Sequence, residues 1–409
     1  MQRSLRTKDV ISSCSWLVCC AAVLMLAGCG DGTAGSQTGS GMWRTEISDT
    51  QQRLYDVACL SALRCLAVGE AGTIIATADG GTTWRAQVNP LQGSSNALYG
   101  IACVAPSSCY VIARPDTILV THDGGTGWSS HALDVGASGS SVTDEACLGD
   151  YTPISGRLAL CRLGLLDIAC VSAQVCYAVA TAPTAYGDNP LPTTSHSAPS
   201  SIWMTRDGGA SWTSQPLPQG VACDGDCVDG LYGYPLVWVS CLSSGLCRAG
   251  GGHVLGCGHC GFAYAVLKTR ASGLGWACSG SAAACTTVSP DAADCPGSSD
   301  CYGIQSTNPF GPANFVFRST DGGAHWVQTG PDWTTSVLND IACPAALTCF
   351  IAGSRGTIAR MTSGSTVSAE PTLTTSDLFG IGCAGPATCY AVGDNGVILA
   401  RRVVPQASG

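Results

Sequence analysis

The chain has 409 residues and a formal net charge of −9, with 19 Lys and Arg against 28 Asp and Glu. This acidic balance disfavours a nucleic-acid partner, because binding to a phosphate backbone depends on basic side chains. With 52 glycines, 26 cysteines, 11% charged residues and no long helical periodicity, the composition predicts many short strands joined by turns.

The N-terminus has the pattern of an export signal. Arg3, Arg6 and Lys8 precede an apolar run over residues 10–26, which is too short for a comfortable membrane span. The run ends in Leu26-Ala27-Gly28-Cys29, which resembles the bacterial lipobox, in which the cysteine is lipidated and becomes the new N-terminus. A plain secretory signal that is cleaved elsewhere is the alternative interpretation.

These features predict the following organisation. Residues 1–28 are a lipoprotein signal peptide, Cys29 is the lipidation site, and the Gly- and Ser-rich residues 29–41 are a flexible tether. We expect a protein that is exported and lipid-anchored to the outer face of the bacterial cytoplasmic membrane, at the cell surface or in the periplasm. Once Cys29 and the signal-peptide cysteines are set aside, 22 cysteines remain, an even number suited to disulfides in an oxidising compartment.

A pair of cysteines separated by five residues recurs seven times. In each copy an apolar segment leads into the first cysteine, a turn-like stretch follows, and a second apolar strand starts from the second cysteine, as at residues 98–113. This order predicts a β-hairpin whose strands are joined by a structural disulfide. The seven pairs are Cys59/Cys65, Cys103/Cys109, Cys170/Cys176, Cys241/Cys247, Cys295/Cys301, Cys343/Cys349 and Cys383/Cys389.

A second motif follows four of these hairpins, at residues 77–84, 121–128, 205–212 and 319–326. It resembles the Asp-box, the Ser/Thr-x-Asp-x-Gly-x-x-Trp hairpin of sialidase-type and related β-propellers, also called the BNR repeat. An aspartate can accept N–H bonds across a tight turn, the glycine permits a left-handed backbone, and the tryptophan packs into the core. We therefore assign a structural role to Asp79, Trp84, Asp123, Trp128, Asp207, Trp212, Asp321 and Trp326, and predict no catalytic residue among them.

Together the two motifs define a unit of four strands, which is one propeller blade. We predict an all-β, seven-bladed β-propeller of four-stranded antiparallel blades over residues 42–409, each with a Cys-x5-Cys hairpin disulfide. The last unit has only three strands, whereas residues 42–46 look like an isolated fourth strand. The N-terminal strand is therefore expected to complete the last blade and close the ring, which removes an exposed sheet edge.

The loops that differ most in length fall on one face of this predicted ring. The cystine hairpins and the Asp-boxes occupy one face, and the long insertions over blades 2–5 occupy the other. Elaborated loops are where a scaffold carries recognition. The candidate binding residues on this loop face are Tyr186, Tyr232, Tyr234, His253, His259 and Phe310. Eight further cysteines, whose pairing is left open, lie in or beside the insertions: Cys147, Cys161, Cys223, Cys227, Cys257, Cys260, Cys278 and Cys285.

Two constellations are candidate ion sites. His253, Cys257, His259 and Cys260 have ligand types suited to zinc, but in an exported, cystine-rich chain disulfides explain the cysteines better. We therefore predict no metal and no cofactor. Asp56, Asp167 and Asp340 each stand three residues before the first cysteine of a blade, so they are expected near one level of the channel. They either bind a cation or a basic partner, or hydrogen-bond between blades, and we favour the second role.

The favoured function is a surface-anchored, monomeric, non-enzymatic binding or assembly scaffold that recognises a protein or a glycan through the loop face. The Ala-Val-Gly that follows the second cysteine and the Gly-x-Ile that precedes the Asp-box, as in residues 67–74, resemble the photosystem II stability and assembly factor propellers and their bacterial relatives. This resemblance covers nearly the whole mature chain and implies the fold more strongly than the partner.

The alternative is an extracytoplasmic glycoside hydrolase of sialidase-like type. Sialidases, which this chain resembles in its Asp-boxes, also require an arginine triad, an Arg-Ile-Pro segment and a tyrosine paired with a glutamate, and no Arg-Ile-Pro occurs here. Another hydrolase of this fold would need two positioned carboxylates on the loop face. Those available are Asp144, Glu145, Asp150, Asp224, Asp226 and Asp229. Peptide capture in the channel, as in sortilin-like propellers, would normally use more than seven blades.

Overall fold

The computed structural model describes residues 42–104, 107–135, 164–181, 200–217, 236–254, 262–269, 275–279, 289–306, 314–333 and 336–402. The chain divides into two compact units, Met1–Ser40 and Gly41–Gly409, and every described residue lies in the second. Among the described residues, no helix is long and apolar enough to cross a membrane.

The second unit consists of seven four-stranded antiparallel sheets, the blades of a β-propeller. From the innermost strand outward, blade 1 has β2 (Leu54–Cys59), β3 (Cys65–Gly69), β4 (Ile74–Thr77) and β5 (Arg85–Ala86). Blade 2 has β6 (Leu98–Val104), β7 (Ser108–Ala113), β8 (Thr117–Thr121) and β9 (Ser129–Ala132). Blade 3 has β10 (Gly164–Cys170), β11 (Cys176–Thr181), β12 (Ser201–Thr205) and β13 (Thr213–Gln215). Blade 4 has β14 (Trp238–Cys241), β15 (Cys247–Val254), β16 (Phe262–Thr269) and β17 (Trp276–Cys278).

The remaining blades follow the same order. Blade 5 has β18 (Ala292–Asp294), β19 (Cys301–Gln305), β20 (Asn314–Ser319) and β21 (Val327–Trp333). Blade 6 has β22 (Leu338–Ala345), β23 (Thr348–Gly353), β24 (Ile358–Thr362) and β25 (Thr366–Glu370). Blade 7 has β26 (Leu378–Gly385), β27 (Thr388–Gly393), β28 (Ile398–Arg402) and, last, β1 (Trp43–Glu46).

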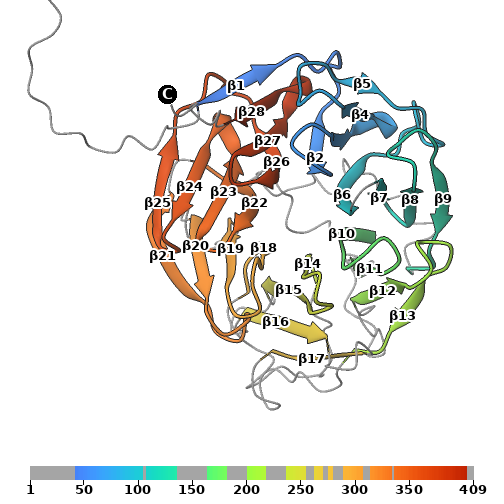
Figure 1. The fold of residues 1–409 in the computed structure, drawn as a ribbon. Coiled ribbons are helices and arrows are strands. Elements are labelled where there is room, and N and C mark those ends of the chain that lie inside the picture. The colour runs from blue at the N-terminus through green and yellow to red at the C-terminus, as the bar shows by residue number, and fades with distance from the viewer. Residues whose placement is uncertain are drawn as a thin grey trace, which may run out of the picture. The chain divides into compact units, whose positions relative to one another are not determined.

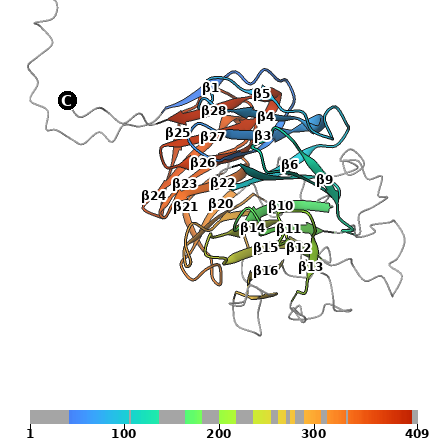
Figure 2. The ribbon, with the colours of Figure 1, turned by 45° about the vertical axis from the view of Figure 1, so that its right-hand side comes forward.

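Blade 7 confirms the predicted closure of the ring. β1 pairs antiparallel with β28, with Trp43 opposite Arg401 and Glu46 opposite Ile398, so strands from both ends of the chain share one sheet. Each innermost strand also contacts those of the two neighbouring blades, from β2 through β26 and back to β2. The fold is therefore the seven-bladed propeller that the repeats predict, and Figure 2 shows the same blades turned by 45°.

The core lies between the blades. Strands β3 and β7 are buried along their whole length, as the continuous apolar sequences of second strands predict. Their side chains pack across the seam between blades, as where Leu66 and Val68 of β3 meet Leu119 of β8. Because strands such as β3 and β7 are covered on both faces by the neighbouring blades, the propeller needs no single central core.

Each predicted hairpin disulfide is present, at the turn between the first and second strands of its blade. The seven bonds are Cys59–Cys65, Cys103–Cys109, Cys170–Cys176, Cys241–Cys247, Cys295–Cys301, Cys343–Cys349 and Cys383–Cys389. Cys278, at the end of β17, is also disulfide-bonded, and its partner lies outside the described residues. The other seven cysteines of the second group also lie outside the described residues, so their pairing stays open.

The start of the second strand was predicted wrongly in three blades. The sequence predicts that this strand starts from the second cysteine, but β7, β23 and β27 begin one residue earlier. Cys109, Cys349 and Cys389 therefore lie inside their strands. The reason is that the ladder continues beyond the cystine in these hairpins. Ser108 lies opposite Val104 in blade 2, and after a register shift Thr348 lies opposite Ala345 in blade 6 and Thr388 opposite Gly385 in blade 7.

The second cysteines are also more deeply buried than a cystine at a surface turn would be. The first cysteines Cys59 and Cys103 are half-buried, since they end strands that lead into the turn. The second cysteines belong to strands that are covered on both faces, so their sulfurs are part of the packing between blades. Those with 0% exposure are Cys65, Cys109, Cys176, Cys247, Cys301, Cys349 and Cys389.

Three consecutive blades carry the same short turn between their second and third strands. In blades 6, 7 and 1 these are the single 3-10 turns η3 (Ser354–Gly356), η4 (Asp394–Gly396) and η1 (Glu70–Gly72). The middle residue of each is left-handed, with φ values of 57° at Arg355, 55° at Asn395 and 52° at Ala71. In this sector the loop face of the propeller is therefore compact, unlike the predicted insertions over blades 2–5.

Candidate functional site

The Asp-boxes form closed local networks. In the first box the hydroxyl of Thr77 donates to Asp79 Oδ1 at 2.8 Å and accepts from the N–H of Gly81 at 2.7 Å. Asp79 in turn accepts from the N–H and the hydroxyl of Thr83. These bonds from Thr83 lower the pKa of Asp79 to about 2. The carboxylate is therefore held ionised by the turn that it organises.

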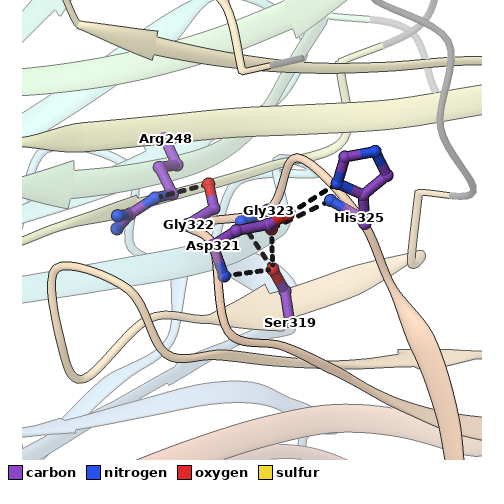
Figure 3. A network of polar contacts seen from close by, with 6 residues as sticks. All are labelled: Arg248, Ser319, Asp321, Gly322, Gly323 and His325. Carbon is purple, nitrogen blue, oxygen red and sulfur yellow. Dashed lines mark hydrogen bonds and ion pairs between the residues drawn. The ribbon is translucent and has the colours of Figure 1, made fainter.

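The fourth box also receives a side chain from the blade before it (Figure 3). Arg248 of β15, which is 2% exposed, donates from Nε to the carbonyl of Gly322 at 2.9 Å and from its terminal nitrogens to the carbonyls of Gly297 and Ser298. Asp321 meanwhile accepts from Ser319 and from the N–H of His325. One buried guanidinium thus joins the box and the neighbouring cystine hairpin of blade 5 to blade 4.

A histidine does the same between blades 2 and 3. His122 lies with Nδ1 3.0 Å from the hydroxyl of Ser108 and Nε2 2.9 Å from the carbonyl of Gly208, a glycine of the third box. A carbonyl cannot donate, so Nε2 carries the proton and Nδ1 accepts from Ser108. Ser108 is only 5% exposed, so this serine and histidine act as a bridge between blades and not as a hydrolytic pair.

The predicted channel aspartates also bridge blades. Asp56 accepts from its neighbour Val57 at 2.7 Å and, across the seam, from the N–H of Ile101 at 2.8 Å. Asp167 accepts in the same way from Val239 in blade 4, and Asp340 from Ile381 in blade 7, each at 2.8 Å. This confirms the interpretation that these carboxylates hydrogen-bond between blades.

The three carboxylates also interact with one another. Burial, and then repulsion by Asp340 and Asp167, raise the pKa of Asp56 well above its usual value. All three line a small cavity of about 60 Å³ between the inner strands, whose other walls include Tyr99 and Trp238. No group of three metal-ligating side chains occurs in the part of the chain that the structure describes. The inner channel is therefore a narrow space lined by carboxyl groups that hydrogen-bond between blades.

A fourth aspartate, Asp294, serves the same purpose from a different position. It accepts from the N–H of Cys343 in blade 6 and from the hydroxyl of Ser240 in blade 4, so it joins three blades. Burial raises its pKa. Asp294 directly precedes the first cysteine of blade 5, so a search for aspartates three residues before that cysteine misses it.

An aromatic column lies where the innermost strands begin on the loop face. Tyr55 stacks on Tyr99 at 4.6 Å between ring centroids and contacts Phe379 at 5.7 Å, which links blades 7, 1 and 2. Guanidinium groups cover both ends, Arg53 over Phe379 and Arg114 over Tyr99. The three rings stand at β-bulges, because the register shifts at each of these residues. Bulges redirect side chains, and here they direct three rings together.

Charged neighbours fix the column at one end. Arg53 donates from Nε to Asp394 at 2.6 Å and lies 3.6 Å from Glu70, and the hydroxyl of Tyr55 donates to Glu70. Burial raises the pKa of Tyr55. Tyr55 has a ring on either side and Tyr99 lies between Tyr55 and Arg114, so the column offers edges and charged groups rather than an open stacking platform.

Of the six residues predicted to form the binding face, the structure describes His253 alone, so it does not test that prediction. His253 lies in β15, where its backbone pairs with Ala263. The other five, Tyr186, Tyr232, Tyr234, His259 and Phe310, lie outside the described residues, as do the proposed hydrolase carboxylates, Cys257 and Cys260. The aromatic column was missed by sequence reasoning, although Tyr55, Tyr99 and Phe379 share one position, four residues before the first cysteine of their blades.

Comparison with known proteins supports the architecture. The sequence pattern of the family described as photosynthesis system II assembly factor YCF48 matches residues 36–148. The chain is similar in structure to YCF48 bound to a D1 peptide, with 15% identity, a TM-score of 0.56 and coverage of 89% of this chain and 96% of that one. For YCF48 from Cyanidioschyzon merolae these values are 16%, 0.57, 88% and 98%.

Enzymes share the fold as well. A GH74 xyloglucanase from Xanthomonas campestris matches with 12% identity and a TM-score of 0.57, over 90% of this chain and 55% of that one. A streptogramin B lyase matches with 11% identity, a TM-score of 0.53 and coverage of 88% and 97%. No curated protein sequence matches the chain. The chain is a BNR-like β-propeller that resembles YCF48, and at these identities the structural likeness establishes the fold alone.

Proposed function

We propose that this protein is a non-enzymatic scaffold that binds a polypeptide segment of a partner protein through the loop face of its propeller. The observation that carries the proposal is the likeness, over nearly the full length of both chains, to a propeller solved with a bound D1 peptide. This likeness supports binding of a polypeptide but does not identify the partner as a photosystem protein, because the predicted insertions over blades 2–5 depart from that family's pattern.

The chemistry of the described residues supports binding over catalysis. The channel carboxylates Asp56, Asp167 and Asp340 each accept backbone N–H bonds, and His122 bridges two blades through both ring nitrogens. A catalytic acid or base must be able to reach the substrate proton. A glycan ligand and a hydrolytic site built from the loop carboxylates outside the described residues are the competing proposals.

The proposal includes the anchoring inferred from the sequence. Residues 1–28 act as the export signal, Cys29 carries the lipid, residues 29–41 form the tether and residues 42–409 form a monomeric propeller outside the cytoplasmic membrane. Metabolic labelling with a lipid analogue tests this part: the wild-type chain should incorporate label and Cys29→Ala should not. Equal labelling of the wild type and Cys29→Ala would overturn the lipid anchor at Cys29 but would leave the proposed binding function standing.

The binding function is tested by crosslinking in cells that express the intact chain, with crosslinked partners identified by mass spectrometry. The comparison uses a chain in which residues 182–199, between β11 and β12, are replaced by a short linker. We expect one protein to be recovered reproducibly and to be lost with this loop. Turnover of a glycoside panel by the purified chain would instead establish the hydrolase.

A further inference from the structure

A groove lies at the outer rim of the propeller, between blades 7 and 1. One wall is the connection that leaves β1, including Asp49 and Thr50, and the other is formed by Ile74, Trp84, Arg85 and Gln92 of blade 1. β1 and β5, the outermost strands of blades 7 and 1, follow one another along the rim in both views of the fold (Figures 1 and 2). The groove, here called the rim groove, has a volume of about 400 Å³, within the usual range of ligand sites.

Two exposed apolar side chains lie close in sequence to residues that line the rim groove. Ile47 directly precedes the connection that forms one wall and is 76% exposed, and Val88 follows β5 on the other side and is 78% exposed. A single exposed apolar side chain needs no explanation. Here two of them stand within two residues in sequence of the groove lining, one before Ser48 and one after Ala86, and the lining itself includes the edges of Ile74 and Trp84.

The rim groove also presents one charge of each sign. Asp49 and Arg85 both line it and both are exposed, and neither side chain has a hydrogen bond or ion pair to another described residue. The position of Asp49 is fixed by a left-handed backbone, with φ at 56°. A ligand that places a cation near Asp49 and an anion near Arg85 would therefore pair both without breaking an existing contact.

The strand beside the rim groove is an open edge. β5 is only two residues long and is the outermost strand of blade 1, pairing with β4 alone among the described strands. Edge strands present unpaired N–H and C=O groups to which an extended peptide can add.

We propose that the rim groove binds an extended peptide segment of a partner protein, laid beside β5 as an added strand. Apolar side chains at alternate positions contact Ile47 and Val88, while one basic and one acidic side chain pair with Asp49 and Arg85. This inference rests on the proposed function and specifies where and by what chemistry the segment binds.

The test measures fluorescence anisotropy with the full chain and a labelled, blocked peptide of alternating valines that carries one lysine and one glutamate. We expect saturable binding that weakens at least tenfold in Arg85→Gln and in Val88→Ser. Lys268→Gln and Val327→Ser, exposed changes on blades 4 and 5, are matched controls and should bind as wild type. Absence of binding, or equal loss in the controls, would overturn the proposal.

A charge reversal distinguishes specific ion pairing with the peptide from non-specific binding. Arg85→Glu should bind a probe with two lysines more tightly than the probe with one lysine and one glutamate, reversing the order of the wild type. If the order of affinities for the two probes is the same as in the wild type, Arg85 does not pair with an acidic side chain of the peptide. If the partner identified by crosslinking is captured equally by Arg85→Glu, the rim groove is the wrong place while the scaffold function stands.

Discussion

Asp167 illustrates how one residue closes a seam between blades. Its two carboxylate oxygens accept from Ile168 in its own strand and from Val239 in the next blade. Replacement by alanine leaves both N–H groups without this acceptor, and an unsatisfied buried donor costs about 1–3 kcal/mol. We expect Asp167→Ala to lower the free energy of unfolding in urea by about 2–4 kcal/mol, from two such donors with partial relaxation.

The matched control for this prediction is Asp49→Asn, which changes an exposed carboxylate that has no partner among the described residues and leaves a residue tolerant of its left-handed backbone. It should change the unfolding free energy by less than about 0.5 kcal/mol. Equal effects of the two substitutions would mean that the hydrogen bond from Val239 to Asp167 does not contribute to the free energy of unfolding.

Two groups of aspartates should respond to pH in opposite directions. The folded state raises the pKa of Asp56 through burial and repulsion by Asp340, so its contribution to stability is greatest in acid and is lost as pH rises through the folded pKa. Hydrogen bonds lower the pKa of Asp79 and Asp207 to about 2, so their contributions are present above the unfolded pKa near 4 and are lost as pH falls toward 2.

Urea unfolding of Asp56→Asn, Asp79→Asn and the wild type at several pH values checks both signs. The stability difference between wild type and Asp56→Asn should shift toward the variant as pH rises. The difference between wild type and Asp79→Asn should shrink below pH 4, because the wild-type carboxyl becomes protonated there. The same pH trend in both variants would contradict the opposite directions assigned to the pKa shifts of Asp56 and Asp79.

At the scale of elements, each Asp-box is held by its own turn and by the blade before it. Arg248 occupies the position after the second cysteine, where Tyr110 stands in blade 2, and both side chains reach a hairpin carbonyl of the next blade. The box glycines are required by the same packing: a Cβ on Gly209, whose φ is 90°, would lie 2.8 Å from Val120 of blade 2. The blade seams are thus built from repeated contacts with varied side chains.

Arg248→Met tests this seam, because methionine keeps the apolar stem and removes the three donors to Gly322, Gly297 and Ser298. We expect a loss of about 1–3 kcal/mol in unfolding free energy, together with faster hydrogen exchange in blades 4 and 5 than in blades 1 and 2. Arg206→Met, an exposed change in the third box, is the control. Uniform exchange across the ring would refute a local seam.

The elements were predicted with different success for physical reasons. The hairpins and the Asp-boxes depend on neighbours in sequence, so their motifs specify Cys59–Cys65 and the Thr77–Asp79 turn without knowledge of the ring. The hydrogen bonds of Arg248 and Asp294 depend on which blade packs against their own, and the residues around them in sequence do not indicate that neighbour. The stacked rings at the bulges had a signal, their shared position, but a bulge cannot be read from alternation alone.

For the whole molecule, closure depends on four residues from the N-terminal end of the propeller. Trp43 of β1 is 2% exposed, packs against Phe350 and donates from its indole to Glu370 of blade 6 at 2.6 Å. The closing strand therefore also ties blade 7 to blade 6. This part of the fold was predictable because the last repeat lacks a strand that the N-terminus can supply.

Trp43→Ala should destabilise the propeller by about 3–5 kcal/mol, the usual cost of removing a buried tryptophan. Because β1 has only four residues, the variant should also expose the edge of β28 and become prone to self-association. Denaturant unfolding with light scattering measures both effects. A monomeric variant with wild-type stability would show that β1 does not close the ring.

The rigid frame and the proposed recognition surface occupy different faces of this molecule. Cystine hairpins and Asp-boxes stand on one face, while the compact turns of blades 6, 7 and 1, the aromatic column and the connection that borders the rim groove stand on the other. The binding face predicted from the insertions lies outside the described residues and stays a prediction. The rim groove and the aromatic column are each formed by residues that are distant in sequence and that the ring geometry brings together.

The most direct test of the account is residue-level crosslinking mass spectrometry of the full chain with its captured partner. We expect one protein partner whose crosslinks cluster on the loop face and beside the rim groove, with none on the cystine hairpins or on the turns of the Asp-boxes. Crosslinks centred on the Asp-box face, or glycoside turnover by the purified chain without a protein partner, would contradict it.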